Sequence, residues 1–464
     1  MSKNKGIHFE ISERKVLLRI FDILVVLLAL ELIGYYFQFD YFLVTKEQWL
    51  WSLVLGFYLT VFGTIFELYN LKQSSKLDTT FKNIVITVSV TVLFYLFTPI
   101  ITPVLPDHRL EIVYFYLSII TAIFIWRYTY VTFIASPRFY KKVIVLGEVS
   151  NIENLVNAFS ISDPNYKIVG YINSNVSSNE NVKFKGLKEF SAGNLQKTIR
   201  EEGISEIVIA INDSETITPY TYNELTHLLE KGFIIREYTQ VFEEITKRIP
   251  VQFVGKDFYK YFPFSRSNQN KLYMLYHRLM DLTCSILGIV IGVLLLPLVL
   301  VGNLIGNKGK LLYIQKRVGK NGEPFNIYKF RTMVKNAEKD GVKWADKNDH
   351  RVTSFGRFLR RSRLDEIPQF INVLKGDMSI IGPRPERPFF VKELSRVIPF
   401  YETRHTIKPG LSGWAQVNSR YGASIEDSLV KLQYDLYYIK HRSFFLDINI
   451  IVKTLSTMVY YRGQ

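Results

Sequence analysis

Cysteine is nearly absent from this chain of 464 residues, because Cys284 is the only one. A single thiol excludes an intrachain disulfide and also excludes a metal site built on several cysteines. It gives no indication of an oxidising compartment. We interpret Cys284 as a small side chain that packs against its neighbours.

Acidic residues are too few to balance the basic ones, so the formal net charge is +16. Such a charge is common in proteins that bind nucleic acid, but here the lysines and arginines flank long apolar stretches. That arrangement is typical of cytoplasmic membrane loops that face an anionic leaflet. We therefore expect a lipid bilayer as a partner and no nucleic acid.

A complete dinucleotide-binding loop is also missing. The run KKVIVLGEVSNI (141–152) supplies only the first glycine, Gly147, of the pattern GxGxxG. No tyrosine in the chain is followed by lysine four residues later, although NAD-dependent sugar epimerases and dehydratases usually carry that pair. Two alternative classes stay open: a membrane-anchored NAD-dependent sugar-nucleotide enzyme and a non-enzymatic transporter or polysaccharide assembly scaffold.

Long apolar runs, in contrast, are plentiful near the N-terminus. Four of them are long enough to cross a bilayer, at about 16–37, 49–69, 84–105 and 110–134. The first carries charged residues and is not followed by a small-residue cleavage site, so we do not expect a cleavable signal. Basic residues before the first run and after the fourth predict that both ends of this bundle face the cytoplasm.

The segment 137–250 has a different pattern. Short β-branched runs, KKVIVLG, YKIVGYI and SEIVIAI, alternate with polar stretches of helical character. This alternation predicts a parallel, Rossmann-like α/β sheet. Because its glycine loop is incomplete, we expect a scaffold, regulatory or dimerisation role for it.

A fifth apolar run lies at 282–305 and contains no charged residue. Basic residues stand on both sides of it, which predicts that both flanks are cytoplasmic. Pro297 removes a backbone hydrogen bond and bends a helix. We therefore predict a re-entrant helix at about 280–305 that breaks at Pro297 and returns to the same side, with a plain fifth span as the alternative.

The string RSRLDEIPQFINVLKGDMSIIGPRPERP (361–388) places the adjacent carboxylates Asp365 and Glu366 among arginines, prolines and glycines. A carboxylate can attack a phosphoryl group, or hold Mg²⁺ beside phosphates, while arginines stabilise the charge that develops. An arbitrary Asp-Glu pair is usually a solvated helix surface. The surrounding string instead predicts a site that handles phosphate.

Three further motifs accompany this string: KFRTM (329–333), IKPGLSGWAQVN (407–418) and YDLYYIKHRSFFLDINI (434–450). Together the motifs resemble the bacterial sugar transferases, and more narrowly the large polyprenyl-phosphate hexose-1-phosphate transferases, which have a monotopic phosphoglycosyltransferase domain. The resemblance covers 271–464. It implies transfer of hexose-1-phosphate from a UDP-hexose to undecaprenyl phosphate, with release of UMP, as the first step of exopolysaccharide, capsule or O-antigen synthesis.

The same resemblance implies roles for individual residues. Asp365 matches the acidic residue that attacks the sugar-bearing phosphate and forms a covalent phosphosugar intermediate. Glu366 is its partner and acts as base, as Mg²⁺ ligand or as positioning group. Asp435 matches another acidic position, either in the Mg²⁺ shell with Asp365 or as a buried structural carboxylate. The expected contacts to phosphate and donor are Lys329, Arg331, Arg360, Arg384, Gln416 and Arg420.

One residue departs from the family pattern, because relatives often have a small hydroxyl residue where this chain has Arg363. The extra positive charge stands two positions before Asp365. It would alter either the donor preference or the phosphate contacts.

The predicted fold is a multi-domain membrane protein with an α-rich catalytic domain at its C-terminus. Its parts are a cytoplasmic tail (1–15), a four-helix transmembrane bundle (16–136), a Rossmann-like α/β domain (137–250), a linker (251–270) and the catalytic domain (271–464). The resemblance places the enzyme at the cytoplasmic face of a bacterial inner membrane, with Mg²⁺ as cofactor. UDP-glucose is the first donor we expect, with UDP-galactose and UDP-N-acetyl or deoxyamino sugars as alternatives, and the middle domain is compatible with a homodimer.

Overall fold

The computed structural model of this chain describes a defined set of residues. They are 11–39, 49–74, 77–134, 140–147, 156, 166–173, 187–210, 218–251, 270–307, 309–334, 337, 349–419, 422 and 424–459. The chain divides into two compact units, Met1–Thr246 and Lys247–Gln464. It is mostly helical and contains a parallel sheet.

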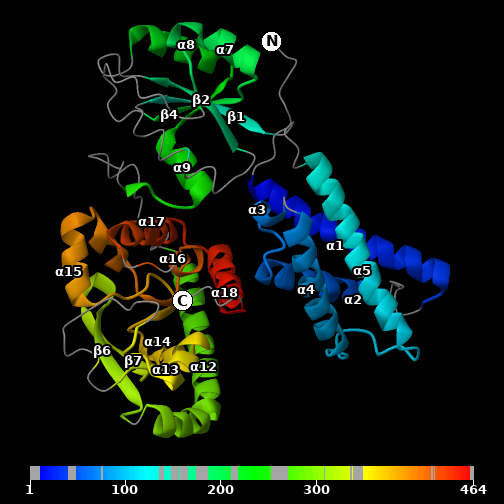
Figure 1. Cartoon of the computed structure of the whole chain (residues 1–464), viewed down its shortest axis with the longest axis vertical. Coiled ribbons are helices and arrows are strands. Elements are labelled where there is room, and N and C mark those ends of the chain that lie inside the picture. Colours follow the sequence, from blue (N-terminus) through cyan, green and yellow to red (C-terminus); the bar gives the residue numbers. More distant parts are fainter. Residues whose placement is uncertain are drawn as a thin grey trace. The chain divides into compact units, whose positions relative to one another are not determined.

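The first unit begins with long helices at all four predicted membrane stretches. They are α1 (Ile11–Phe37), α2 (Trp49–Ile65), α4 (Leu77–Leu96) and α5 (Leu110–Thr129), with a short α3 (Leu71–Ser74) and a π-helical turn (Tyr130–Ile134). In Figure 1 these helices form one bundle. Within the described part of the chain, three helices are long and apolar enough to cross a membrane: α4, the segment Leu110–Phe133, and α12 (Lys271–Gly306) of the second unit.

The third predicted stretch, 84–105, differs from the helix that forms there. Helix α4 begins earlier, at Leu77, and ends at Leu96. Pro99 and Pro103 follow that end. A proline lacks the backbone N–H that a helix needs and disfavours helical conformation in the residue before it. The apolar residues after Leu96 therefore extend the hydrophobic run without extending the helix.

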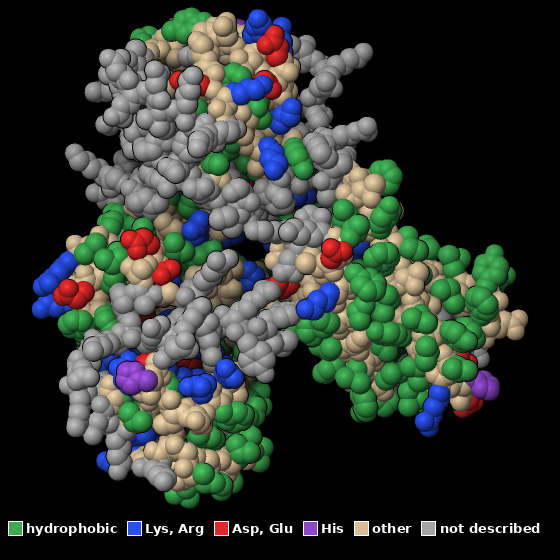
Figure 2. Space-filling view, viewed as in Figure 1, with side chains coloured by type: hydrophobic (Ala, Val, Ile, Leu, Met, Phe, Trp, Pro, Cys, Tyr) green, Lys and Arg blue, Asp and Glu red, His purple; other side chains and the backbone are tan. Residues whose placement is uncertain are grey.

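The bundle is apolar outside and holds a buried ion pair inside. Figure 2 shows apolar side chains over most of its visible face, which suits contact with lipid tails. Arg127 of α5 donates to Asp22 of α1 at 2.6 Å, and both side chains are buried. Charged groups in a membrane bundle are expensive unless they pair. This pair therefore joins α1 to α5 in one specific arrangement.

The α/β part of the first unit confirms the predicted parallel sheet. Its strands are β1 (Lys141–Gly147), β2 (Tyr166–Asn173), β3 (Lys188–Glu189), β4 (Glu206–Ala210) and β5 (Ile234–Glu237), in the order β3-β2-β1-β4-β5. All their pairings are parallel. Helices α7 (Leu195–Glu202), α8 (Pro219–Glu230) and α9 (Tyr238–Thr246) accompany the sheet.

Gly147, the residue that resembled the start of a nucleotide loop, has a packing role at the end of β1. A Cβ atom at this position would collide with the carbonyl oxygen of Ala210 on β4. Glycine is therefore needed for the close approach of two neighbouring strands. This contact explains the glycine without a bound cofactor.

The second unit is built around α12 and two small strand pairs. Strands β6 (Leu312–Val318) and β7 (Pro324–Phe330) form an antiparallel hairpin, and β8 (Ser379–Ile381) pairs in parallel with β9 (Gly410–Ser412). The other helices are α13 (Ser354–Arg361), α14 (Gln369–Lys375), α15 (Pro388–Val397), α16 (Trp414–Asn418), α17 (Ile425–His441) and α18 (Phe444–Val459), with short 3₁₀ turns at Lys320–Gly322, Leu364–Glu366 and Tyr401–Thr406.

Helix α12 differs from the predicted broken helix, because it runs without interruption over 36 residues with Pro297 inside it. Figure 1 shows that it changes direction toward its C-terminal end. Pro297 gives a physical reason for such a bend, since its ring prevents one backbone hydrogen bond and crowds the preceding turn. A re-entrant course through the membrane stays a prediction.

The segment Lys247–Val251, just after α9, packs into the second unit. Ile249 and Val251 are buried in its main apolar core, and the Ile249 amide donates to the Gln433 carbonyl of α17 at 3.1 Å. The Lys247 carbonyl accepts from the Trp414 indole at 3.1 Å. This segment is therefore an integral strap of the second unit.

Replacing Ile249 with alanine should loosen this unit. Removing a buried isoleucine side chain costs about 2–5 kcal/mol, because transfer free energy is lost and a cavity remains. We expect faster hydrogen exchange of the α17 amides in Ile249→Ala. Ile425→Ala, at an exposed position of the same helix, is the matched control and should change little. Equal effects of the two substitutions would show that the strap does not support α17.

Candidate functional site

The two carboxylates of the LDE string lie in a short turn between α13 and α14. The turn is the 3₁₀ segment Leu364–Glu366, and Arg363 enters it with a left-handed backbone, φ 58°. The Asp365 residue is 9% exposed, and the Glu366 side chain is 11% exposed. The local fold thus holds two adjacent acids in a largely dehydrated position.

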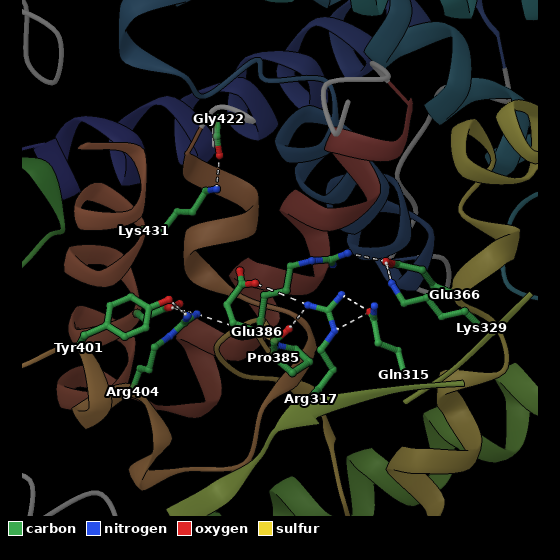
Figure 3. Close-up of polar contacts among 12 residues, drawn as sticks. Gln315, Arg317, Lys329, Glu366, Pro385, Glu386, Tyr401, Arg404, Gly422 and Lys431 are labelled. Carbon is green, nitrogen blue, oxygen red and sulfur yellow. Dashed lines mark hydrogen bonds and ion pairs between the residues drawn. The ribbon is translucent and has the colours of Figure 1, made fainter. Parts of the chain in front are cut away.

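Glu366 is surrounded by three positive side chains from three parts of the chain. Its Oε1 accepts from Arg384 Nη2 at 2.7 Å and from Lys329 Nζ at 3.4 Å, and its Oε2 lies 3.8 Å from Arg363 Nη1. Figure 3 shows Glu366 and Lys329 pointing toward one another, with the contacts drawn. The strand β7, the loop before α15 and the turn itself each contribute one cation.

These cations determine the charge of Glu366. Burial alone would raise the pKa of its carboxyl group. Arg384, Lys329 and Arg363 outweigh that effect and hold the pKa well below its usual range. Glu366 is therefore ionised at neutral pH, and it is a weak proton acceptor.

Asp365 has the opposite electrostatic balance. Burial raises the pKa of Asp365 to about 6, and the negative charge of Glu366 acts in the same direction. Lys329, Arg360 and Arg363 oppose this rise without cancelling it. Among the described residues, no hydrogen bond or ion pair engages the Asp365 carboxylate. A buried carboxylate that changes charge near neutral pH and stands ready for a ligand fits a nucleophile.

The hairpin β6–β7 positions Lys329 for this site. In the antiparallel register Lys329 lies opposite Tyr313. Burial lowers the pKa of the Lys329 ammonium group, although Glu366 and Asp365 act to raise it. The two carboxylates therefore help to keep the buried Lys329 ammonium group protonated.

Arg360 and Arg331, expected to contact phosphate, have different surroundings. Arg360 Nε donates to the Thr332 hydroxyl at 3.0 Å, and its charge acts on Asp365. Arg331 Nε donates to the Lys310 carbonyl at 2.9 Å. The structure thus brings Arg360 to the acidic pair, whereas the Arg331 guanidinium is held by the loop after α12.

The two residues expected near the donor from the IKPGLSGWAQVN string are not brought to the acidic pair by any described contact. Gln416 Nε2 donates to the Leu411 carbonyl at 3.1 Å, inside its own motif, and Gln416 Oε1 is buried without a hydrogen bond partner among the described residues. Arg420 lies outside the described residues. Donor contacts by these two residues stay predictions.

Asp435 lies in a buried ion pair. It accepts from Arg404 Nη2 at 2.7 Å, and both side chains are almost fully buried. Burial raises the pKa of Asp435 to about 6, although Arg404 opposes the rise. Of the two roles that the resemblance implied, these contacts support the structural carboxylate and give no support to a place in a Mg²⁺ shell.

Two arginines near the site, the buried Arg404 and the partly buried Arg317, were not singled out from the sequence. Arg404 bonds Tyr401, Asp435 and the Arg384 carbonyl, and Arg317 bonds Gln315 and the Pro385 carbonyl. Figure 3 shows the contacts of both arginines beside those of Glu366. A weak signal existed for Arg317, because the alternation of β6 places it on the same face as Tyr313 and Gln315. No local pattern marks Arg404.

The fit of these residues to Mg²⁺ rests on Asp365. Mg²⁺ is usually held by one or two carboxylates together with substrate phosphates and water. Asp365 offers such a carboxylate, whereas the oxygens of Glu366 already face three cations. Within the described residues, no group of three or more His, Cys, Asp or Glu side chains is suited to a metal ion. The donor set therefore offers Mg²⁺ one protein carboxylate, Asp365, among the described residues.

Comparison with known proteins agrees with this geometry. The family model for the bacterial sugar transferase matches residues 272–461, which include every site residue described above. A UDP-N-acetylgalactosamine-undecaprenyl-phosphate N-acetylgalactosaminephosphotransferase of Aeromonas hydrophila is 44% identical over 188 residues, which are 40% of this chain and 44% of the relative. A UDP-glucose:undecaprenyl-phosphate glucose-1-phosphate transferase of Xanthomonas campestris pv. campestris is 41% identical over 203 residues, 43% of this chain and 40% of the relative.

The matches thus cover less than half the length of these two relatives. A shorter relative, an uncharacterized sugar transferase of Bacillus subtilis (strain 168), is 37% identical over 196 residues, which are 41% of this chain and 90% of the relative. The shared region is therefore almost a whole protein in that species. On these grounds the chain belongs to the bacterial sugar transferase family.

Proposed function

We propose that this protein is a phosphoglycosyltransferase that moves a hexose-1-phosphate from a UDP-sugar to undecaprenyl phosphate and releases UMP. The observation that carries the proposal is Asp365, a buried carboxylate with no bonded partner among the described residues and with cations around it. The names of the two longer relatives support both the acceptor and the type of reaction.

The reaction has two steps at one phosphorus atom. An oxygen of Asp365 bonds to the phosphorus that carries the sugar, and the bond from that phosphorus to the bridging oxygen breaks, so UMP leaves with the electron pair. An oxygen of undecaprenyl phosphate then bonds to the same phosphorus, and the bond to Asp365 breaks. The carboxylate is regenerated, and the product is a sugar joined to the lipid through a diphosphate.

The positive side chains stabilise the charge that builds up on the phosphoryl oxygens. Arg384, Lys329 and Arg363 surround Glu366 at the edge of the site, and Arg360 acts on Asp365. Because its pKa is held so low, Glu366 suits the role of a positioning group for these cations better than that of a general base. When bound, Mg²⁺ would neutralise part of the donor diphosphate charge.

The names of these relatives suggest which donors to test first. One relative is named for N-acetylgalactosamine and the other for glucose, with 44% and 41% identity. UDP-glucose and UDP-N-acetylgalactosamine are therefore the first donors to test. UDP-galactose and deoxyamino sugars complete the panel.

The membrane setting follows from the apolar helices. We propose a multi-pass protein of the bacterial inner membrane whose catalytic unit faces the cytoplasm, where nucleotide sugars are made. Its product would begin a surface polysaccharide. Helix α12, the most hydrophobic of the three candidate spans, would anchor the catalytic unit by a re-entrant course.

The direct test is UMP release by purified membranes with Mg²⁺, undecaprenyl phosphate and the panel of UDP-sugars. We expect lipid-dependent release from one donor, and a loss of at least 10³-fold in Asp365→Asn and Asp365→Ala, which lack the attacking oxygen anion, roughly as for other covalent nucleophiles. Asp377→Asn, at an exposed position, is the control and should stay active. Full release in both Asp365 variants would remove this residue as the nucleophile.

The raised pKa of Asp365 predicts an acid limit to activity. Because only the ionised carboxylate attacks phosphorus, kcat/KM should fall about tenfold per pH unit below a midpoint near pH 6. Lys329→Gln removes a cation that favours the ionised form, so its midpoint should move to higher pH. Lys320→Gln, on the exposed hairpin tip, should leave the midpoint unchanged. A wild-type midpoint near 4 would contradict the described balance of charges.

Arg363 should lower the stability of the protein while its charge supports activity. Its left-handed backbone is costly for a residue other than glycine, by roughly 1 kcal/mol. Arg363→Gly should therefore keep or slightly raise the melting temperature, while activity falls on the order of 10- to 100-fold because a charged contact is lost. The neighbouring Arg361→Gly, in the last turn of α13, should lower the melting temperature, because glycine is unfavourable in a helix, and should leave the activity unchanged. Equal activity in the two variants would leave Arg363 without a functional role.

A further inference from the structure

The loop that carries Arg384 has no regular secondary structure, yet its backbone is held along its whole length. It runs from Pro383 to Arg387, between β8 and α15. Pro383, Pro385 and Pro388 have no N–H to satisfy and restrict the φ angles of the loop. The carbonyl groups of the loop, in contrast, all need hydrogen bond donors where they are buried.

Each of these five consecutive carbonyls has a donor. Gly410 N donates to Pro383 O at 2.9 Å, Val318 N to Glu386 O at 2.9 Å, and Val391 N to Arg387 O at 3.0 Å. The remaining two carbonyls take side-chain donors. Arg404 Nη2 donates to Arg384 O at 3.0 Å, and Arg317 Nη1 donates to Pro385 O at 3.1 Å.

The Arg404 side chain is itself fixed by two further hydrogen bonds. Its guanidinium donates to Asp435 of α17 at 2.7 Å and to the Tyr401 hydroxyl at 2.8 Å. The Arg404 side chain is 6% exposed and that of Asp435 is 2% exposed. A buried guanidinium that is fixed by a carboxylate presents its remaining N–H in a defined direction.

Arg317 holds the loop from the other side, on the hairpin strand β6. Its Nε and Nη2 donate to Gln315 Oε1 at 3.1 and 2.7 Å, and its Nη1 lies 3.5 Å from the Glu386 carboxylate. Figure 3 shows Arg317 between Gln315, Pro385 and Glu386. The two arginines therefore donate hydrogen bonds to adjacent carbonyls of one short loop from two different elements.

We propose that Arg317 and Arg404 form a clamp that fixes the backbone at Arg384 and so aims its guanidinium at Glu366 and at the donor diphosphate. Both are positioning residues, because they act through Arg384. Lysine cannot replace them, since a single ammonium does not reach a carboxylate, a backbone carbonyl and a third oxygen with fixed planar geometry. The clamp gives Asp435 its place in the enzyme, as the buried carboxylate that orients Arg404.

The part of the proposal that concerns the donor rests on the proposed function, so the first measurement does not need activity. Hydrogen exchange of the full chain in detergent follows the amides of Val318 and Gly410, which bond the loop carbonyls. In Arg317→Lys and in Arg404→Lys both amides should exchange at least tenfold faster than in the wild type. Arg396→Lys, on the exposed face of α15, should show wild-type exchange. Unchanged exchange in both clamp variants would overturn the proposal.

The second measurement asks whether the clamp acts through Arg384. Arg384→Ala should raise KM for the UDP-sugar, and both clamp variants should raise it in the same way, whereas a general loss of folded enzyme lowers only the apparent kcat. In the Arg384→Ala background, Arg404→Lys should change kcat/KM by less than about twofold, because coupled residues are not additive. Effects that multiply fully would overturn the proposed route.

The clamp can still be tested if a variant does not fold or if the wild type shows no activity. If Arg404→Lys does not fold, Tyr401→Phe removes one partner of the same guanidinium, and Arg317→Lys tests the other arm. If the wild type releases UMP from no donor, the proposed function fails, while hydrogen exchange still decides whether the clamp exists.

Discussion

The ionised Glu366 and its three cations are the interaction on which the second unit depends. A carboxylate that is almost removed from water is costly unless positive charge compensates for it. Here the compensation comes from Lys329 at the end of the hairpin, Arg384 on a proline-rich loop and Arg363 in the turn itself. Each cation is likewise partly dehydrated and needs the acid. Misplacing any of these three elements would therefore reduce the positive charge that compensates for Glu366.

This arrangement also separates the two adjacent acids. Glu366 has most of the nearby positive charge, and its own negative charge then raises the pKa of Asp365. Neighbouring carboxyls with different surroundings commonly take different chemical roles. The fixed anion holds the surrounding cations, and in the described part of the chain the second acid has no bonded partner. One charge constraint thus accounts for both the architecture of the turn and its proposed chemistry.

Sequence patterns predicted what depends on local order. Apolar runs predicted the long helices of the first unit, β-branched runs predicted the parallel sheet, and the LDE string predicted the acidic pair. The end of α4 was missed because hydropathy continues past Pro99, where helical hydrogen bonding does not. The contacts of Arg317 and Arg404 join residues 68 and 20 positions apart in the chain. Such pairings depend on how β6 and the Tyr401–Thr406 turn meet the loop, which no local pattern states.

Helix α12, a candidate membrane span, packs against the segment that follows the acidic pair. A Cβ at Gly292 would lie 2.6 Å from Ile367, the residue directly after Glu366, and one at Gly288 would collide with Phe370 of α14. Glycine costs about 1 kcal/mol in a helix interior, but here it lets the segment after the acidic pair lie directly on the apolar helix. In the proposed membrane setting, α12 rather than a flexible tether would set the height of Asp365 relative to the bilayer, so that a lipid phosphate at headgroup depth could reach the carboxylate.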